Sequence, residues 1–173
     1  MLGAAQIRAR VRRLARQIDE DYRDLDDPLS VIVVLKGACF FAVDLLRCLK
    51  IPTRLDFLQA SSYKGVNSTG EVRLHKDISM PIAGARVLLV EDIVDTGVTA
   101  RWLIRHLESH SPKDVKLCAL LDKPSRRLTP VTLDYTGFTV ADVFAIGYGL
   151  DFQESHRSLP SIYEAVVETQ QQD

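Results

Sequence analysis

The sequence predicts an α/β fold built on an open, mostly parallel and twisted sheet that is flanked by helices. Short apolar runs, typical of buried strands, alternate along the chain with amphipathic segments of helical length. This alternation favours parallel strands that are joined by crossover helices. Polar residues also follow directly after several of the apolar runs, where the ligands of such sheets bind. We therefore expect a binding site at the carboxyl edge of the sheet.

Composition indicates one globular domain that spans residues 1–173. The hydrophobic fraction of 46% and the charged fraction of 26% are typical of a soluble globular protein. A net charge of −1 gives no overall positive potential, so a nucleic-acid partner is not expected. No apolar run approaches the roughly 20 residues of a membrane helix, so a membrane partner is not expected either.

The three cysteines, Cys39, Cys48 and Cys118, lie in apolar segments and lack the spacing of metal ligands. They are expected to be buried, reduced thiols of a cytoplasmic protein.

The first segment combines a basic composition with helical periodicity. Its five arginines precede any acidic residue, as in a mitochondrial transit peptide: Arg8, Arg10, Arg12, Arg13 and Arg16. Apolar residues nevertheless recur at helical spacing and continue into an acidic stretch: Ile7, Val11, Leu14 and Ile18. The sequence therefore favours an amphipathic first helix of the mature protein.

The next third of the chain contains two strands and a helix before a polar segment. Residues 26–28 end the first helix, and we predict strands over 30–35 and 53–59 and a helix over 39–49. Residues 61–70 are rich in Ser, Gly, Asn and Thr, which predicts a mobile excursion that leads into a strand near 72–74.

The central motif is a buried strand that leads through acidic residues into a helix. Residues 87–90 predict the strand, Glu91 and Asp92 stand where it is expected to end, and a tight turn over 95–99 precedes a helix over 101–110. A helix N-terminus presents free backbone N–H groups and a dipole that favours an anion. Carboxylates beside such an anion site suit a sugar phosphate or Mg²⁺. The alternative is an ordinary strand–turn–helix with a solvated acidic cap.

Strand predictions are weaker toward the end of the chain. The predicted strands are 115–121, the weaker candidates 131–134 and 138–140, and a last strand over 143–146. Residues 161–169 are ambiguous between a strand and a helix.

Several polar residues follow predicted strands and should gather at one edge of the sheet: Lys36, Gly37, Glu91, Asp92, Lys123 and Asp151. Each has an ordinary alternative. Lys36 could be a solvated turn lysine, and a charged loop would explain Arg126 more easily than Lys123. From the residues alone Phe144 could equally belong to the core, and Arg157 could lie on the surface.

These motifs, in this order, resemble the type I phosphoribosyltransferases, and more narrowly the hypoxanthine-guanine phosphoribosyltransferases. The central motif resembles the phosphoribosyl diphosphate (PRPP) signature of the wider superfamily. The narrower likeness depends on Lys123-Pro124 together with 147–151, and the resemblance runs from about residue 30 to 157. It implies the type I phosphoribosyltransferase fold, with a small hood and a mobile lid loop that contains Ser62 and Tyr63.

The function implied by the resemblance is purine salvage. The phosphoribosyl group of PRPP would be transferred, with Mg²⁺ as cofactor, to N9 of hypoxanthine or guanine, giving IMP or GMP and pyrophosphate. A homodimer or homotetramer is expected. Two alternatives remain: an enzyme for another base, such as xanthine or uracil, and a regulatory protein that keeps the fold but binds nucleic acid.

The resemblance also assigns roles to the PRPP site. Glu91 and Asp92 would hold the ribose hydroxyls, directly or through Mg²⁺, and Asp151 would lie near a second Mg²⁺ on pyrophosphate. Backbone amides and hydroxyls of the turn would hold the 5′-phosphate; its residues are Asp95, Thr96, Gly97, Val98 and Thr99.

The remaining roles concern the leaving group and the base. Lys36, Gly37 and Arg157 would face pyrophosphate, and the Leu35–Lys36 peptide can be cis in this family. Lys123 would donate to the purine O6, Phe144 would stack on the ring, and Ala145 would meet the base edge. Asp95 would be the catalytic residue, accepting a proton from purine N7 or hydrogen-bonding to it.

Two positions depart from some members of the family. Val98 stands where some carry a lysine, which predicts a weaker phosphate contact. Ser155 and His156 replace an aromatic pair before Arg157, which changes the expected packing around pyrophosphate.

Overall fold

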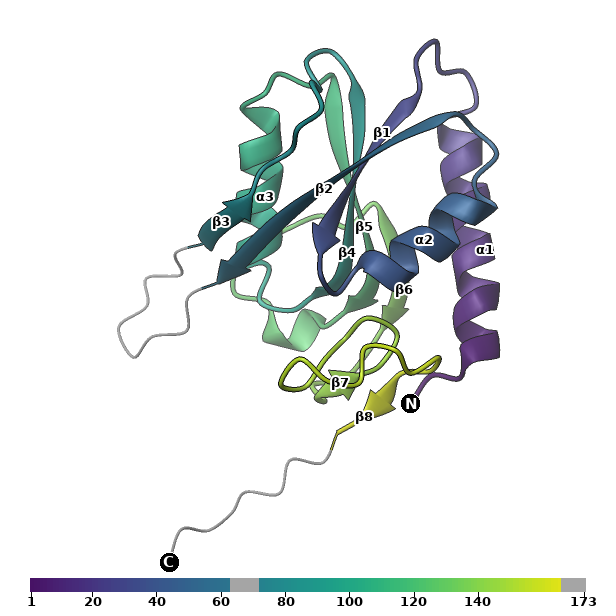
Figure 1. Cartoon of the computed structure of the whole chain (residues 1–173), viewed down its shortest axis with the longest axis vertical. Coiled ribbons are helices and arrows are strands. Elements are labelled where there is room, and N and C mark those ends of the chain that lie inside the picture. Colours follow the sequence, from purple (N-terminus) through teal and green to yellow (C-terminus); the bar gives the residue numbers. More distant parts are fainter. Residues whose placement is uncertain (63–71, 166–173) are drawn as a thin grey trace, which may run out of the picture.

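The computed structural model describes residues 1–62 and 72–165. In this part of the chain a six-stranded sheet lies between helices, which confirms the predicted α/β fold (Figure 1). The helices are α1 (Ala4–Asp21), α2 (Cys39–Cys48), α3 (Val98–Glu108) and the 3₁₀ helix η1 (Pro124–Arg126). The sheet strands are β1 (Leu29–Leu35), β2 (Thr53–Ser62), β3 (Val72–Lys76), β4 (Arg86–Val94), β5 (Asp114–Asp122) and β6 (Tyr135–Thr139).

The order of the strands places a crossover at the centre of the sheet. The order is β3-β2-β1-β4-β5-β6, and every neighbouring pair is parallel except β2 with β3. The chain leaves β1 toward β2 on one side and leaves β4 toward β5 on the other. In open α/β sheets such a reversal opens a crevice at the carboxyl ends of the two strands, where ligands bind.

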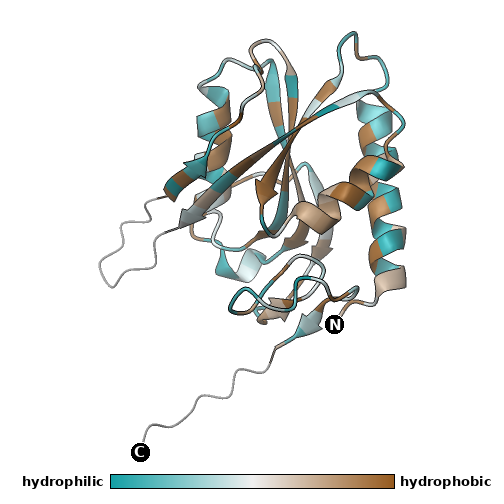
Figure 2. Ribbon diagram, viewed as in Figure 1, coloured by the Kyte–Doolittle hydropathy of each residue, from teal (hydrophilic) through white to brown (hydrophobic). Residues whose placement is uncertain are grey.

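Two apolar cores cover the two faces of the sheet. On one face α1 and α2 pack through residues such as Leu14 and Phe41, and on the other α3 packs through Leu103 and Leu107. In Figure 2 the strands are predominantly brown, whereas the outer sides of the helices are teal. The helical spacing at the N-terminus is thereby explained, because Ile7, Val11, Leu14, Ala15 and Ile18 are the buried residues of α1.

A small hood lies beyond the carboxyl ends of the sheet strands (Figure 1). It contains the antiparallel pair β7 (Ala145–Ile146) and β8 (Tyr163–Glu164). The predicted strand over 143–146 is therefore wrong as a sheet member, because only two of its residues pair, and they pair in the hood. Leu2 forms an antiparallel bridge with Ile162, which ties the hood to the start of α1.

Other predictions need correction. The strand candidate 131–134 is irregular chain, whereas the candidate 138–140 corresponds to the end of β6, which already begins at Tyr135. Val131 packs against the α3 core instead of pairing. Of the three cysteines only Cys118 is buried, whereas Cys39 and Cys48 are partly exposed; all three are free thiols.

No helix within residues 1–62 and 72–165 has the length and apolar character needed to cross a membrane.

Candidate active site

The acidic pair lies inside the central strand instead of after it. β4 continues to Val94, so Glu91 and Asp92 are strand residues, and Glu91 is paired in register with Ala119 of β5. The side chain of Glu91 is buried and that of Asp92 is partly exposed. The structure therefore fixes both carboxylates on a rigid strand at the crossover.

Burial changes the acidity of this pair. It raises the pKa of the Glu91 carboxyl well above its usual range, and the neighbouring charge of Asp92 raises that pKa further. Burial also raises the pKa of Asp92, although the backbone N–H of Ile93 and the charge of Arg157 act in the opposite direction. Two acids held this close without a cation are electrostatically unfavourable, which marks the pair as a candidate functional group.

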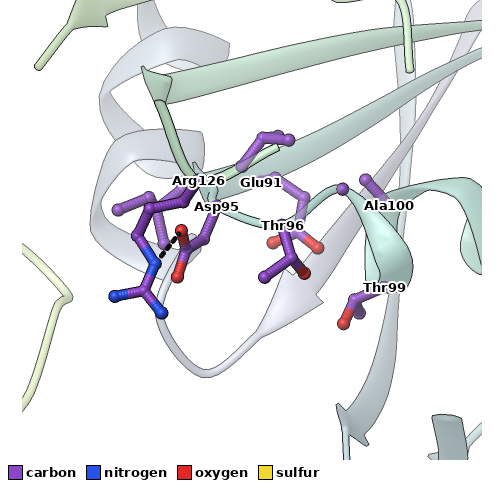
Figure 3. A pocket seen from close by; sticks show the side chains of 9 residues that line it. Glu91, Asp95, Thr96, Thr99, Ala100 and Arg126 are labelled. Carbon is purple, nitrogen blue, oxygen red and sulfur yellow. Dashed lines mark ion pairs between the residues drawn. The ribbon is translucent and has the colours of Figure 1, made fainter. Parts of the chain in front are cut away.

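The turn after β4 forms the first cavity. A hollow of about 260 Å³ is lined by Glu91, Ile93, Val94, Asp95, Thr96, Gly97, Thr99, Ala100 and Arg126 (Figure 3). α3 begins at Val98, earlier than the predicted residue 101, so the backbone N–H groups of its first turn belong to this turn. Those groups lack helical partners and are suited to an anion of phosphate size.

Glycine is required at position 97 for two reasons. Its φ of +83° lies in the left-handed region, and a Cβ there would overlap the Thr129 carbonyl oxygen. The backbone N–H groups of Leu128 and Thr129 donate to the Thr96 carbonyl at 2.9 and 3.0 Å. The segment after η1 therefore braces the turn.

A second cavity, of about 350 Å³, adjoins the first. Its lining includes three residues of the first cavity, Glu91, Ile93 and Thr99, and adds Lys36, Gly37, Asp92, Asp151 and Arg157. Gly37 approaches Asp92 so closely that a Cβ on it would overlap the Asp92 carboxylate. The peptide bond between Leu35 and Lys36 is cis.

Charged residues line the second cavity, Asp151 and Arg157 from the hood and Lys36 from the turn after β1. Arg157 Nη2 lies 2.7 Å from Asp151 Oδ1, and Arg157 Nη1 donates to the Gly149 carbonyl at 2.7 Å. Lys36 Nζ donates to Glu154 Oε2 at 2.8 Å, although both side chains are more than half exposed. The structure thus brings Lys36, Asp151 and Arg157 together, and Arg157 is not a surface residue, since its side chain is only 20% exposed.

Lys123 is bonded both to the strand end at the first cavity and to the residue before Phe144. The side chain of Lys123 is buried and its Nζ donates to the Val143 carbonyl at 2.5 Å, while its backbone N–H donates to the Val94 carbonyl at 3.0 Å. Lys123 thereby connects the residue before Phe144 with the residue before Asp95. Phe144 is 46% exposed, so it is not a core residue, and it meets Phe152 edge to face with ring centroids 5.6 Å apart. Ala145, next along the chain, is buried at the start of β7.

Arg126 and Glu154, which lie in or beside the cavities, were not predicted as site residues. Arg126, which a charged loop seemed to explain, lines the first cavity and lies with its Nε 3.0 Å from Asp95 Oδ1 (Figure 3). Glu154 lies between Lys36 and Arg157. The double arginine after Lys123-Pro124 was the available signal for Arg126, whereas nothing in the sequence distinguished Glu154.

The expected lid over 61–70 lies largely outside the described residues. Ser62 is the last residue of β2 and pairs with Val72 through its backbone. Tyr63 and most of the predicted excursion over 61–70 lie outside the described residues.

Taken together, the described geometry suits a phosphorylated sugar. It offers an anion site at a helix N-terminus, carboxylates for hydroxyls or a divalent cation, and a cationic arginine and lysine at the far side of the second cavity.

Comparisons with known proteins agree with this description. The family model of the phosphoribosyl transferase domain matches residues 3–153. The hypoxanthine-guanine phosphoribosyltransferase of Mycobacterium tuberculosis is 43% identical over 167 residues, which cover 94% of this chain and 83% of that protein. The hypoxanthine phosphoribosyltransferase of Escherichia coli is 39% identical over 168 residues, or 96% of this chain and 94% of that protein.

Solved structures give the same result. A hypoxanthine-guanine phosphoribosyltransferase from Bacillus anthracis matches with a TM-score of 0.91 and 43% identity, covering 96% of this chain and 97% of that one. The hypoxanthine phosphoribosyltransferase from Trypanosoma cruzi, solved in complex with the product IMP, matches with a TM-score of 0.89 and 37% identity, covering 95% and 91%.

Proposed function

The chain belongs to the phosphoribosyl transferase domain family, and we propose that it acts in purine salvage as a hypoxanthine-guanine phosphoribosyltransferase. It transfers the 5-phosphoribosyl group of PRPP to N9 of hypoxanthine or guanine and forms IMP or GMP and pyrophosphate. One observation of the site supports this function above all. Asp95, the phosphate-binding turn and the buried Glu91 line one cavity, and the backbone bond of Lys123 to Val94 holds the lysine beside it.

The substrate PRPP fits the two adjoining cavities. We propose that the first turn of α3 and the hydroxyls of Thr96 and Thr99 bind the 5′-phosphate. Lys36 and Arg157, at the second cavity, bind the pyrophosphate that becomes the leaving group. Glu91 and Asp92 lie between these ends and accept hydrogen bonds from the ribose hydroxyls.

The donor set fits Mg²⁺. Glu91, Asp92 and Asp151 all line the second cavity and offer only carboxylate oxygens, the ligands that Mg²⁺ prefers. The raised pKa of Glu91 is a second observation, because a buried acidic pair gains most from a nearby cation. When bound, Mg²⁺ would neutralise negative charge on the pyrophosphate.

The proposed base site explains a preference for 6-oxopurines. Lys123 is a donor without an acceptor, so it can pair with O6 of hypoxanthine or guanine but not usefully with a 6-amino group. Phe144, partly exposed and adjacent to Val143, offers a ring face for stacking, and Ala145 would meet the base edge through its backbone.

The chemistry proceeds by displacement at C1 of the ribose. Purine N9 forms the new bond, the bond between C1 and pyrophosphate breaks, and the sugar carries positive charge in the transition state. Asp95 accepts the proton from purine N7, or hydrogen-bonds to it, as the charge on the base changes. Arg157 and Lys36 stabilise the developing charge on the leaving group, the kind of stabilisation that usually gives the largest rate effect.

Other features stay predictions. These are the lid over 61–70 that would exclude water, assembly into a homodimer or homotetramer, a cytoplasmic location and the single-domain organisation of residues 1–173.

A base panel tests the proposal. The purified protein is incubated with PRPP, Mg²⁺ and, separately, hypoxanthine, guanine, xanthine, adenine or uracil, and formation of each monophosphate is measured. Hypoxanthine or guanine should be converted far faster than adenine, because rejection of a ligand that leaves a buried polar group unpaired can reach several orders of magnitude. Equal turnover of adenine and hypoxanthine would overturn the assignment. Turnover of xanthine or uracil alone would identify an enzyme for that base, and nucleic-acid binding without any turnover would identify a regulatory protein.

A further inference from the structure

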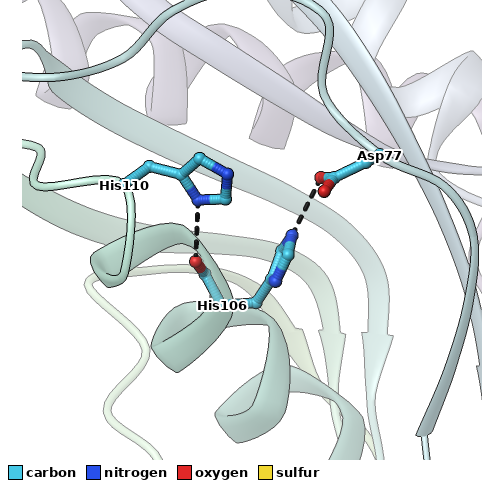
Figure 4. Close-up of side chains that lie close together, drawn as sticks. All are labelled: Asp77, His106 and His110. Atoms are coloured by element: carbon cyan, nitrogen blue, oxygen red, sulfur yellow. Dashed lines mark hydrogen bonds and ion pairs between the residues drawn. The ribbon is translucent and has the colours of Figure 1, made fainter.

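Two histidines and an aspartate gather on the face of the sheet that carries α3, away from the proposed active site. His106 lies in the last turn of α3, His110 follows its end, and Asp77 comes directly after β3. One ligand atom from each of the three lies within 4.8 Å of the others (Figure 4). Segments far apart in the sequence therefore bring together the donor types that bind zinc-like metals.

Hydrogen bonds already orient these three side chains. His106 Nε2 lies 2.8 Å from Asp77 Oδ1, and His110 Nδ1 lies 3.0 Å from the carbonyl oxygen of His106. A carbonyl oxygen can only accept, so Nδ1 of His110 carries a proton and, in the neutral ring, Nε2 carries the lone pair. A backbone carbonyl that fixes the tautomer in this way is a common companion of metal-binding histidines.

Packing further restricts the His106 ring. The indole of Trp102 stacks on it with centroids 5.1 Å apart and an interplanar angle of 7°, and His110 meets it edge to face at 5.0 Å. The His106 side chain is only 19% exposed, whereas the Asp77 side chain is 41% exposed and its Oδ1 also accepts the Ile78 backbone N–H at 2.7 Å. Both ligands are thus oriented before an ion binds, and the more exposed carboxylate is the one that an ion can reach from solvent.

We propose that Asp77, His106 and His110 form a binding site for a divalent transition metal of the Zn²⁺ class. Donor atoms of a tetrahedral site with bonds of about 2.0–2.1 Å lie about 3.4 Å apart. Ligation widens the 2.8 Å separation of His106 Nε2 and Asp77 Oδ1 to about 3.4 Å, and it draws together the ligand atoms of the cluster, which now lie within 4.8 Å of one another. The metal takes the Nε2 lone pair of each histidine and one carboxylate oxygen. His106 then carries its one ring proton on Nδ1, so a proton now on Nε2 either moves to Nδ1 through solvent or, from the doubly protonated ring, is lost to solvent.

This site differs chemically from the proposed Mg²⁺ site. Glu91, Asp92 and Asp151 offer only oxygen, whereas two imidazole nitrogens favour Zn²⁺, Ni²⁺, Co²⁺ or Cu²⁺. A bound ion would also reinforce the link between the end of β3 and the end of α3, which the bond between Asp77 and His106 already makes.

The fluorescence of Trp102 provides the test, because it is the single tryptophan of the chain. The full-length protein, first freed of metal by a chelator, is titrated with Ni²⁺ in excess Mg²⁺, which occupies oxygen sites. We expect saturable quenching at one equivalent, relieved by Zn²⁺ as a competitor that does not quench by itself. Calorimetry with Zn²⁺ under the same conditions should give the same stoichiometry.

Variants locate the site. His110→Asn and Asp77→Asn should each weaken Zn²⁺ binding at least tenfold in calorimetry, and His106→Asn should do the same. His156→Asn, a histidine of the hood, is the matched control and should bind as the parent protein does. Circular dichroism of each variant checks that it is folded. Binding that is equally strong in His110→Asn and His156→Asn, or quenching that does not saturate, would overturn the proposal.

Discussion

Arg126 Nε lies 3.0 Å from Asp95 Oδ1, so the carboxylate proposed to act on purine N7 is paired with a guanidinium from η1. Both side chains are substantially exposed, at 48% and 38%. Solvent screens ion pairs of this kind, and they contribute little to stability. The pair can therefore open to admit a base, and we expect Arg126 to hold Asp95 in position without taking part in bond making.

Asp95→Asn should separate binding from chemistry. The amide keeps the shape of the side chain but loses its charge and basicity, while the neighbouring N–H groups still hold the 5′-phosphate. We expect kcat to fall about 10²-fold or more, with little change in the KM for PRPP. Arg126→Gln, measured in the same steady-state assay, should change kcat much less. A near-normal kcat in Asp95→Asn would mean that the residue only shapes the turn.

A companion variant addresses the phosphate. Thr99 lines both cavities, and Thr99→Val removes a hydroxyl donor but no base. It should therefore raise the KM for PRPP more than it lowers kcat. The reverse pattern would place Thr99 in the chemical step.

Lys123→Met tests recognition of the base. The substitution keeps an unbranched side chain of nearly the same length and removes its charged donor. Because a hydrogen bond to a charged group contributes about 1.5–3 kcal/mol, kcat/KM for hypoxanthine should fall about 10- to 100-fold. The kcat/KM of Lys123→Met for adenine should not fall by the same factor as that for hypoxanthine. Lys113→Met, at an exposed lysine beside a different cavity, is the control and should leave both rates unchanged.

Gly37→Ala tests the close approach of the turn that follows β1 to Asp92 of β4. The new methyl group would overlap the Asp92 carboxylate, which must then move out of the second cavity. We expect the KM for PRPP to rise and kcat/KM to fall at least tenfold by loss of orientation. Gly3→Ala is the matched control, because a methyl group there meets nothing closer than Gln6 Oε1 at 3.6 Å. Normal kinetics in Gly37→Ala would show that Asp92 does not bind substrate.

Removal of Mg²⁺ tests the carboxylates of the second cavity. Activity should vanish in EDTA and return with added Mg²⁺. Mg²⁺ with PRPP should also raise the Tm of the parent protein, because a ligand that binds only the native state stabilises it. The rise should be smaller in Glu91→Gln. A rate that is unchanged in EDTA would contradict the roles given to Glu91, Asp92 and Asp151.

Because of Asp56 in β2, the free energy of unfolding should decrease as the pH falls into the acid range. Burial acts to raise the pKa of this carboxyl, but it accepts backbone hydrogen bonds from Met80, Phe57 and Ser79, and its pKa is lowered overall. A group whose pKa is lower in the folded state adds stability above its unfolded pKa of about 3.9. That stability is lost as the pH falls through the folded value.

Urea unfolding of Asp56→Asn checks this dependence. The variant should lose about 1–3 kcal/mol of unfolding free energy at pH 7, as expected for hydrogen bonds to a charged group. The difference from the parent protein should be the same at pH 6 and should shrink at pH 3.5. A difference that grows on acidification would contradict the role assigned to Asp56.

The strand and helix cores were predictable because their patterns are local. Spacing alone located α1 through Ile7, Val11 and Leu14, and the apolar runs located β1, β4 and β5. The end of β4 was not predictable, because Glu91 and Asp92 look like the polar end of a strand. Only the tertiary structure shows that β5 pairs alongside them as far as Val94.

Of the two weaker strand predictions, 138–140 corresponds to the end of β6, whereas 131–134 failed for a related reason. The alternating residues 131–134 suit a strand, yet Val131 and Leu133 pack against the α3 core, and the Asp134 carboxylate accepts the Leu117 backbone N–H at 2.8 Å. A side chain there takes the place of a ladder bond, and pairing begins only at Tyr135. The hood was equally hidden, since its two-residue strands are too short to leave a pattern.

Because Leu2 pairs with Ile162, the sheet and the hood fold in a fixed order while the chain is synthesised. The sheet from β1 to β5 needs only residues up to Asp122, so it can form while the hood is still being made. The bridge joins residues 160 positions apart and closes only after Ile162 has left the ribosome, as expected for a contact of long sequence separation. Asp151 and Arg157 emerge in the same late segment. A nascent chain halted before the hood would thus hold a formed sheet and the turn proposed to bind the 5′-phosphate, without the residues proposed to bind pyrophosphate.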